Sequence, residues 1–404
     1  MTAEAAYRRL ETAVGDRDAP FAVVDLDALH ANATALVAQA GGLPVRVASK
    51  SVRCVEVLRR VLAMPGWQGV LAFTPAEACH LAGAGIDDLL VAYPSADRGA
   101  LLAVARRVAD GRPERIVLMV DSVEGAALVA AAAREVGVRL PVAIDVDTAL
   151  RPVHRVTVGV LRSPVRTPGQ AAALARSLAA DPHLDLVALM AYDAQVAGVG
   201  DNVPGRPARS RAVRVMQAAS LRELAGRLPE VVAAVRAEVE GAGGSLELVN
   251  AGGTGSLDRI AANTAVTELS AGSGLFAPTL FDTYRSLALR PAALFALPVV
   301  RRPAPGVVTV LGGGYVASGP AGRDRLPSPV LPAGLRLTGT EGAGEVQTPL
   351  RGAAADRLRI GDRVWFRHTK AGELCERFDR LLLVEGDAVV DEVPTYRGEG
   401  HAFA

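Results

Sequence analysis

The sequence predicts an α/β protein in which a (β/α)8 TIM barrel precedes a C-terminal all-β domain. From residue 20 to about 280, short apolar runs alternate with Ala/Leu/Arg-rich helical stretches, which is typical of a parallel sheet covered by helices. Beyond residue 290 prolines become dense, and short β-rich pieces without helical periods follow. A chain of 404 residues is long enough for both domains.

The strands are expected in nine apolar runs, and their number selects the barrel. In chain order they are "FAVVDL", "PVRVAS", "GVLAFT", "DLLVAYP", "RIVLMVD", "PVAIDVD", "DLVALMAYD", "LELVNAGG" and "AVTELSAG". If the first is a lead-in strand, eight remain, and eight βα units over about 250 residues match a TIM barrel. A doubly wound open sheet is the alternative. We place the barrel at residues 18–288 and the β-rich domain at residues 1–17 and 289–404.

Composition excludes several classes of protein. The 44 basic and 43 acidic residues leave a net charge of +1 without a long run of one sign, so neither nucleic acid nor a membrane surface is an expected partner. The 3 cysteines are no disulfide framework, which indicates a reducing, cytoplasmic setting. No signal peptide opens the chain, and no apolar segment reaches the roughly 18 residues of a membrane span.

The stretch "VRVASKSVRC" places Lys50 just past the end of the first barrel strand. Catalytic groups of TIM barrels lie at this end of the strands, and a desolvated lysine there can act as a nucleophile toward aldehydes. A solvated loop lysine would fit the same position. The chain has very few lysines against many arginines, Lys50 and Lys370 being nearly all of them, which favours a need for a deprotonatable amine.

Two Gly/Ser-rich strand ends are candidate phosphate sites. The segment "VNAGGTGSLDRI" supplies Gly252, Gly253, Thr254, Gly255 and Ser256, and "TELSAGSGLF" supplies Ser273. Glycines allow close backbone approach, and free N–H groups can cradle a phosphate, although a plain tight turn fits the first segment as well. Two such loops on the last two strands are where TIM barrels commonly bind phosphate. Together with a strand-end lysine they suggest pyridoxal phosphate as the cofactor.

These segments, with "FAVVDLDALHANATALV" and "TPAEACHLAGAGIDDLLVAYP", resemble the fold-type III pyridoxal phosphate enzymes of the alanine racemase N-terminal superfamily. The sequence is most similar to the branch of D-threonine aldolase and D-serine dehydratase, and within it to a bacterial group of amino acid deaminases/aldolases. The resemblance implies that Lys50 forms the Schiff base and that the 252–256 loop binds the phosphate. It also implies cofactor contacts for Tyr192, in "LMAYDAQ", and for Arg151 or Arg155, beside His154.

The resemblance also implies a divalent metal, although the sequence departs from the family there. Such enzymes carry a His-x-Cys or His-x-Asp pair, whereas His368 is followed by Thr369 and Lys370. The segment "CERFDRLLLV" aligns with the family's cysteine segment, so Cys375 could pair with His368 across the insertion "TKAGEL", with Glu373 as a third candidate. Zn²⁺ or Mn²⁺ held there would bind the substrate's hydroxyl, which places His368 in the catalytic site. A loop histidine and a buried structural cysteine are the alternative.

The function implied by the resemblance is a lyase for D-configured β-hydroxy amino acids such as D-threonine or D-serine, or their α-substituted analogues. Aldol cleavage and dehydration with deamination both remain open. Two alternatives remain: an amino acid racemase and a non-catalytic pyridoxal phosphate-binding homeostasis protein. Tyr315 could be mistaken for the tyrosine that serves as the second base of a racemase. A nicotinamide dehydrogenase is disfavoured because the glycine motif is not in the first βα turn. The family resemblance further implies a homodimer.

Overall fold

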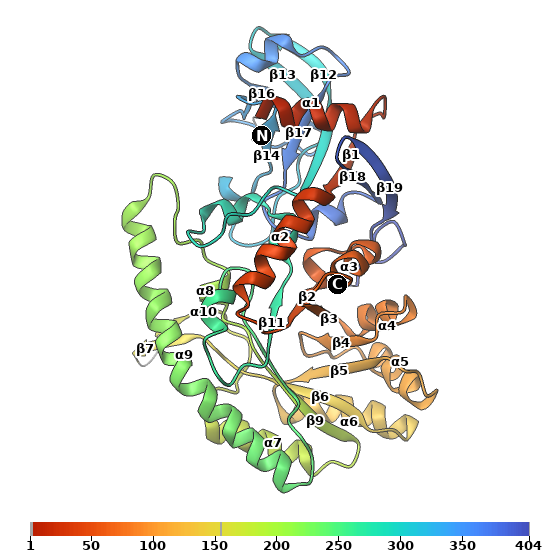
Figure 1. The fold of residues 1–404 in the computed structure, drawn as a ribbon, viewed down its shortest axis with the longest axis vertical. Coiled ribbons are helices and arrows are strands. Elements are labelled where there is room, and N and C mark those ends of the chain that lie inside the picture. The colour runs from red at the N-terminus through yellow and green to blue at the C-terminus, as the bar shows by residue number, and fades with distance from the viewer. Residues whose placement is uncertain (1–2, 154–155, 404) are drawn as a thin grey trace.

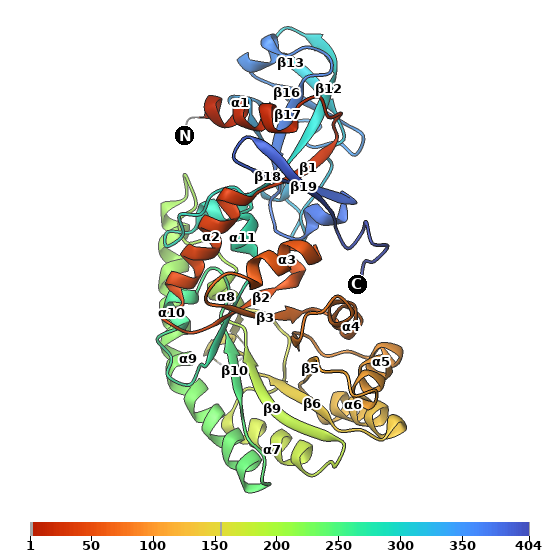
Figure 2. The same cartoon turned by 45° about the vertical axis from the view of Figure 1, so that its right-hand side comes forward.

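The computed structural model describes residues 3–153 and 156–403, which form a barrel and a second, sheet-based domain. Figures 1 and 2 show the barrel in the lower part of the molecule and the sheet-based domain above it. Both the N-terminal and the C-terminal segments reach the upper domain. The predicted fold class, a TIM barrel with a C-terminal β domain, is therefore confirmed.

Eight parallel strands close the barrel in the order β10-β11-β2-β3-β4-β5-β6-β9. They correspond to the eight runs that follow the lead-in run: β2 Val45–Ala48, β3 Trp67–Ala72, β4 Asp88–Val91, β5 Arg115–Val120, β6 Leu140–Asp145, β9 Leu184–Ala191, β10 Leu248–Ala251 and β11 Glu268–Ala271. Most of their side chains are buried, because one face points into the barrel and the other packs under helices. The apolar runs of the sequence follow from this double burial.

Helices surround the barrel in alternation with the strands: α2 Leu26–Gln39, α3 Val55–Leu62, α4 Pro75–Gly83, α5 Arg98–Ala109, α6 Val123–Val136, α7 Pro168–Ala179, α8 Ala194–Ala197, α9 Pro207–Gly241, α10 Leu257–Ile260 and α11 Ser273–Phe276. Polar caps fix several starts. Thr74 before α4, Ser122 before α6 and Thr167 before α7 each accept a hydrogen bond from a backbone N–H of the first turn. The long α9 lies along the side of the barrel opposite α4, α5 and α6 (Figures 1 and 2).

A buried ionic network fills part of the barrel interior. Arg46 of β2 bonds to Glu268 of β11, with Nε to Oε1 at 2.6 Å, and to Asp88 at 2.8 Å. Asn250 of β10 donates to the same Glu268 at 2.7 Å. The charges are paired and hydrogen-bonded, which is the condition under which a buried ion pair is tolerated. The network joins four strands below the mouth of the barrel.

The second domain is a 9-stranded sheet assembled from both ends of the chain. Its strands are β1 Phe21–Asp25, β12 Ala293–Ala304, β13 Val307–Leu311, β14 Ser328–Leu331, β15 Arg336–Leu337, β16 Gln347–Arg351, β17 Arg363–Arg367, β18 Arg380–Glu385 and β19 Ala388–Pro394. The lead-in run is β1, and its Val23 lies opposite Leu294 of β12 and Leu382 of β18. Helix α1, Ala3–Val14, packs on this sheet through Leu10 and Val14. Short 3-10 helices at Ser49–Ser51, Thr279–Thr283, Arg323–Arg325, Ala353–Arg357 and Glu373–Glu376 complete the described elements.

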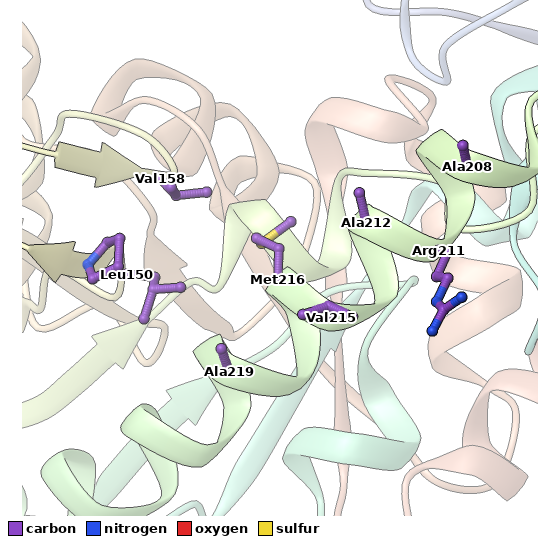
Figure 3. Close-up of a pocket in the computed structure, with 9 residues that line it drawn as sticks. Leu150, Val158, Ala208, Arg211, Ala212, Val215, Met216 and Ala219 are labelled. Atoms are coloured by element: carbon purple, nitrogen blue, oxygen red, sulfur yellow. The ribbon is translucent and has the colours of Figure 1, made fainter.

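A small hairpin, β7 Leu150–Val153 and β8 Val156–Val158, interrupts the barrel between β6 and α7. Between it and α9 lies an apolar groove of about 600 Å³, drawn in Figure 3 with Val158, Val215 and Met216 among its lining residues. Among the described residues, Arg211 is the one charged side chain that lines it. Within the described part of the chain, no helix combines the length and apolarity needed to cross a bilayer. Cys54, Cys79 and Cys375 are free thiols.

Candidate active site

A cavity of about 700 Å³ lies where the C-terminal ends of the barrel strands face the second domain. The barrel contributes Lys50, Tyr93, Tyr192, Thr254 and Ser273 to its wall. The second domain contributes Ser318, Arg325, Lys370 and Glu373. Strand ends are the usual place for an active site in this fold, and the volume suits a cofactor-sized molecule.

Lys50 lies in a short 3-10 turn, Ser49–Ser51, directly after β2. Its Nζ donates to the Tyr93 hydroxyl at 2.7 Å and lies 5.8 Å from the centre of the Tyr192 ring. The turn is fixed on one side by Ser49, which donates to the Leu71 carbonyl, and on the other by a 2.9 Å bond between Ser51 and Ser273. The lysine is therefore an amine with a fixed partner at the barrel mouth.

Two tyrosines and one arginine surround this amine. The Arg162 guanidinium lies 5.5 Å from the centre of the Tyr93 ring and 5.6 Å from that of Tyr192. Burial acts to raise the pKa of Tyr93, but the charge and hydrogen bond of Lys50, helped by Arg162, outweigh it and lower that pKa. Burial raises the pKa of Tyr192. The Tyr93 hydroxyl is thus the more acidic of the two beside the lysine.

The 252–256 loop and the start of α11 form a cradle beside the Lys50 turn, where Ser273 bonds to Ser51. Among the described residues, the backbone N–H groups of Thr254 and Gly255 have no hydrogen-bond acceptor. A Cβ on Gly253 would lie 2.9 Å from the Ala197 Cβ and 3.0 Å from Tyr192, and a Cβ on Gly272 would lie 2.5 Å from the Ala48 carbonyl oxygen. Side chains at these positions would crowd the cradle. Its free N–H groups and hydroxyls suit a phosphate.

Ser256 supports this loop from beneath. Its hydroxyl donates to Asp193 at 3.1 Å and accepts from the Gly253 N–H at 3.2 Å. Burial raises the pKa of Asp193 to about 7, and its second carboxylate oxygen has no partner. Gly255 is needed because a Cβ there would overlap Tyr284. Gly255 and Ser256 therefore shape the loop, whereas Gly252, Gly253 and Thr254 line the cavity.

Of the two arginines expected near the cofactor, the structure describes only Arg151. Arg151, on β7, is exposed and bonds to Asp147 at 2.8 Å, away from the cavity wall. Arg155 and His154 lie outside the described residues. Arg162, which follows the hairpin, lines the cavity instead. Arg162 does not follow a barrel strand in the sequence. It follows the hairpin that is inserted after β6, and this hairpin places it at the barrel mouth.

A loop of the second domain, residues 368–376, packs against the Lys50 turn. A Cβ on Gly372 would overlap the Lys50 carbonyl oxygen, so glycine is required for this approach. Cys375 donates from Sγ to the Val52 carbonyl oxygen at 3.1 Å, and Arg53 pairs with Glu376. The two domains therefore meet at the lysine, and the cavity is closed from the second-domain side by this loop.

His368 and Cys375 do not form a ligand set for a metal ion. Both His368 ring nitrogens are buried without a partner, and burial, aided by Arg367, lowers the pKa of this histidine to about 3. The Cys375 thiol donates to the Val52 carbonyl oxygen at 3.1 Å, so it is engaged in a contact with the backbone of the barrel. Among the described residues no group of three or more His, Cys, Asp or Glu side chains is placed to hold a metal. The predicted Zn²⁺ or Mn²⁺ therefore does not fit these residues.

Lys370 of this loop lines the cavity. Its Nζ donates to the Ser318 hydroxyl at 2.9 Å, and the Ser318 N–H donates to Glu373 at 3.0 Å. Tyr315, the residue a racemase comparison points to, packs instead against Phe295 and Phe378 and does not line the Lys50 cavity of its own chain. The wall from the second domain is thus formed by charged side chains.

The fold and this cavity define a class of protein: a TIM barrel with a strand-end lysine and a glycine-rich cradle, covered by a sheet-based domain. The chain belongs to the family described as "Alanine racemase, N-terminal domain", whose profile matches residues 24–270. The family resemblance predicted from the sequence is thereby confirmed.

Comparisons with individual proteins agree. Over 263 residues the chain is 27% identical to D-threonine aldolase of an Arthrobacter species, a match that spans 64% of this chain and 61% of the relative. It is also 27% identical over 259 residues to 3-hydroxy-D-aspartate aldolase of Paracoccus denitrificans, spanning 64% and 60%. The matched region thus covers about three fifths of these relatives. The structure of D-threonine aldolase from Filomicrobium marinum shares the fold, with a TM-score of 0.74 at 21% identity over 94% of this chain and 95% of that one.

Sequence reasoning named Lys50, Tyr192, Ser273 and the 252–256 loop, and the structure gathers them around one cavity. It missed Tyr93, although a signal was present. Tyr93 stands in "DLLVAYP" just past the end of β4, the same strand-end position that singled out Lys50.

Proposed function

We propose that the protein is a pyridoxal phosphate-dependent lyase acting on D-configured β-hydroxy amino acids, by aldol cleavage or by dehydration and deamination. The observation that supports this most is that the Lys50 amine and a glycine-rich cradle line the same cavity. The named relatives, aldolases of D-threonine and 3-hydroxy-D-aspartate, support the substrate class. When bound, the cofactor supplies an electron sink that makes bonds to the substrate's α-carbon labile.

The residues present fit this cofactor. Lys50 would carry it through Nζ, and the N–H groups of Thr254 and Gly255 with the Ser273 hydroxyl would hold its phosphate. Tyr192, whose ring centre lies 5.8 Å from Lys50 Nζ, would pack against the cofactor's ring. Arg151 lies away from the cavity wall, whereas Arg162 lines it.

Side chains of the cavity can accept the proton that the Lys50 amine must lose. The Tyr93 oxygen, 2.7 Å from Lys50 Nζ, can take a proton from the amine and leave it nucleophilic. The charge of Lys50 lowers the pKa of Tyr93 against the opposing effect of burial, which suits that exchange. Arg162, over both tyrosine rings, is the barrel-side cation placed for the substrate's carboxylate. The second domain limits the entry of water from above.

The test is a substrate screen with the purified protein. We expect turnover of at least one of D-serine, D-threonine and 3-hydroxy-D-aspartate, with release of an aldehyde or of a keto acid and ammonia, and none of the L-isomers. In Lys50→Ala turnover should fall by at least about 10³-fold, because the covalent attachment is lost. Full activity in Lys50→Ala would refute the assignment.

We also propose that the protein is a homodimer in the reducing cytoplasm. Apolar side chains stand exposed around the hairpin and α9, with Leu161 at 84%, Val215 at 65% and Val153 at 61% exposure. Val158 and Met216 line both the groove of Figure 3 and the Lys50 cavity, so a partner covering the groove would also reach the cavity mouth. Light scattering that shows a fully active monomer at micromolar concentration would contradict the dimer.

A further inference from the structure

The sequence contains two lysines, Lys50 and Lys370, and both line the same cavity. Every other basic side chain that carries a permanent charge in this chain is an arginine. An ammonium is a compact charge with rotatable donors, whereas a guanidinium is a wide planar fork. Lysine at position 370 therefore supplies a compact cation inside the cavity where arginine would fill more space.

The position of Lys370 is fixed by its surroundings. Its Nζ bonds to the Ser318 hydroxyl at 2.9 Å, and the neighbouring Thr369 hydroxyl donates to the Leu326 carbonyl at 2.8 Å. Gly372, two residues on, packs its backbone against the Lys50 carbonyl. The ammonium is thus held at a set place relative to the Lys50 turn.

The balance of charge leaves this cation available. Within the described part of the chain, the cavity is lined by one negative side chain, Glu373, and by five positive ones: Lys50, Arg53, Arg162, Arg325 and Lys370. Arg53 is paired with Glu376, and Lys50 is bonded to Tyr93. Glu373 directs one oxygen to the Ser318 N–H, while its other oxygen is buried without a partner. On the second-domain wall, Arg325 lies 3.8 Å from the Asp324 carboxylate, so Lys370, bonded only to the neutral Ser318 among the described residues, is the cation best able to meet a polar group of a ligand.

The groups expected to hold a metal in this region are otherwise engaged or isolated. Cys375 serves the contact with Val52, and among the described residues His368 is not part of any group of three or more side chains of ligand type. We propose that Lys370 binds the oxygen on the β-carbon of the substrate and that the reaction therefore needs no divalent metal. The proposal rests on the proposed function, because it assumes an amino acid held at Lys50 with its side chain toward the second domain.

The chemistry is that of a fixed hydrogen-bond donor. In aldol cleavage the β-hydroxyl loses its proton to solvent as its oxygen becomes the aldehyde oxygen. In dehydration the β-oxygen leaves as hydroxide and takes up a proton from solvent to become water. In both reactions negative charge develops on this oxygen. A preplaced ammonium stabilises that charge without reorganisation, as an oxyanion-binding donor does. Glu373, linked to Lys370 through Ser318, keeps the local charge from repelling the cation out of the cavity.

The experiment compares holoenzyme variants after exhaustive treatment with a chelator. Lys370→Met removes the charge and keeps the apolar length, and Lys370→Arg keeps the charge with a different shape. Arg359→Met is the control, since Arg359 is an exposed arginine of the same domain outside the cavity. Two quantities are measured: kcat and KM for the best D-substrate, and dissociation constants for D-serine and D-alanine from changes in cofactor absorbance.

The chelated wild type and Arg359→Met should keep full activity, with no stoichiometric metal by elemental analysis. Lys370→Met should lose about 10²- to 10³-fold in kcat/KM, the usual cost of removing one such donor. It should also bind D-serine no better than D-alanine, which has no β-oxygen, while its D-alanine affinity stays that of wild type. Lys370→Arg should recover part of the difference.

Loss of wild-type activity on chelation with recovery on added Zn²⁺ or Mn²⁺ would overturn the proposal, as would an unchanged preference for D-serine in Lys370→Met. The binding titration distinguishes the two results even for a variant without turnover. Failure of the proposed function looks different: the wild type would show no cofactor absorbance, or Lys50→Ala would keep its activity.

Discussion

The two walls of the cavity are built from different kinds of group. The barrel wall offers backbone N–H groups, hydroxyls and two tyrosines around Lys50, together with Arg53 and Arg162, whereas the second-domain wall offers Ser318, Arg325, Lys370 and Glu373. Backbone donors on rigid strand ends suit a cofactor that stays in place, and charged side chains suit the recognition of a substrate that comes and goes. The difference suggests that the barrel holds the cofactor and that the second domain, together with Arg162, selects the substrate.

The walls are nevertheless joined at one point. The 368–376 loop of the second domain contacts the Lys50 turn through Gly372, Cys375 and Glu376. A change in this loop can therefore alter the position of the lysine as well as the substrate side. Variants that affect one wall only are the ones that test the separation.

The largest of three effects is expected for the barrel wall in Gly253→Val. A branched side chain there would press on Ala197 and Tyr192, and overpacking of about 1–3 kcal/mol corresponds to a loss of about 10- to 100-fold in cofactor affinity. Cofactor titration followed by absorbance measures it. Gly226→Val, in an open position on α9, is the control and should bind like wild type. An unchanged affinity in a folded Gly253→Val protein would make the loop a simple turn.

Cys375→Ala tests whether the 368–376 loop is structural. Removing a buried sulfur and its contact with Val52 should lower the free energy of unfolding by about 1–2 kcal/mol, measured by urea denaturation. The kcat of the variant should stay within about twofold of wild type, a difference below about 0.5 kcal/mol. Cys79→Ala, at a half-buried thiol outside the cavity, is the matched control. Loss of catalysis together with bound metal in Cys375→Ala would return this residue to a ligand role.

The smallest effect is a pH dependence beneath the phosphate cradle. Burial raises the pKa of Asp193 from 3.8 to about 7, so the folded state favours the protonated form. Its contribution to stability is present below pH 4 and is lost as the pH rises toward 7. The Asp193→Asn variant can still accept a hydrogen bond from Ser256. Its free energy of unfolding, relative to that of wild type, should therefore be higher at pH 8 than at pH 5. Urea unfolding at both values measures this, and an equal difference at the two values would exclude a raised pKa.

The sequence predicts the barrel well because its signals are local. Each strand is an apolar run of its own, and Lys50 and the 252–256 loop follow strand ends that those runs mark. The partners of β1 could not be predicted, since its pairing with β12 and β18 joins residues from opposite ends of the chain. Arg162 was missed because it follows an inserted hairpin and not the end of a barrel strand. Lys370 and Cys375 have local settings that only the packing of the two domains defines.

The most direct test of the account uses the two lysines themselves. The purified protein, supplied with pyridoxal phosphate, is treated with borohydride, digested and mapped by mass spectrometry, with the unreduced protein as the control. The reduced cofactor should be found on the peptide that contains Lys50, with the peptide of Lys370 unlabelled. Label on Lys370, or none on either lysine, would contradict the assignment of Lys50 to the cofactor and of Lys370 to the substrate.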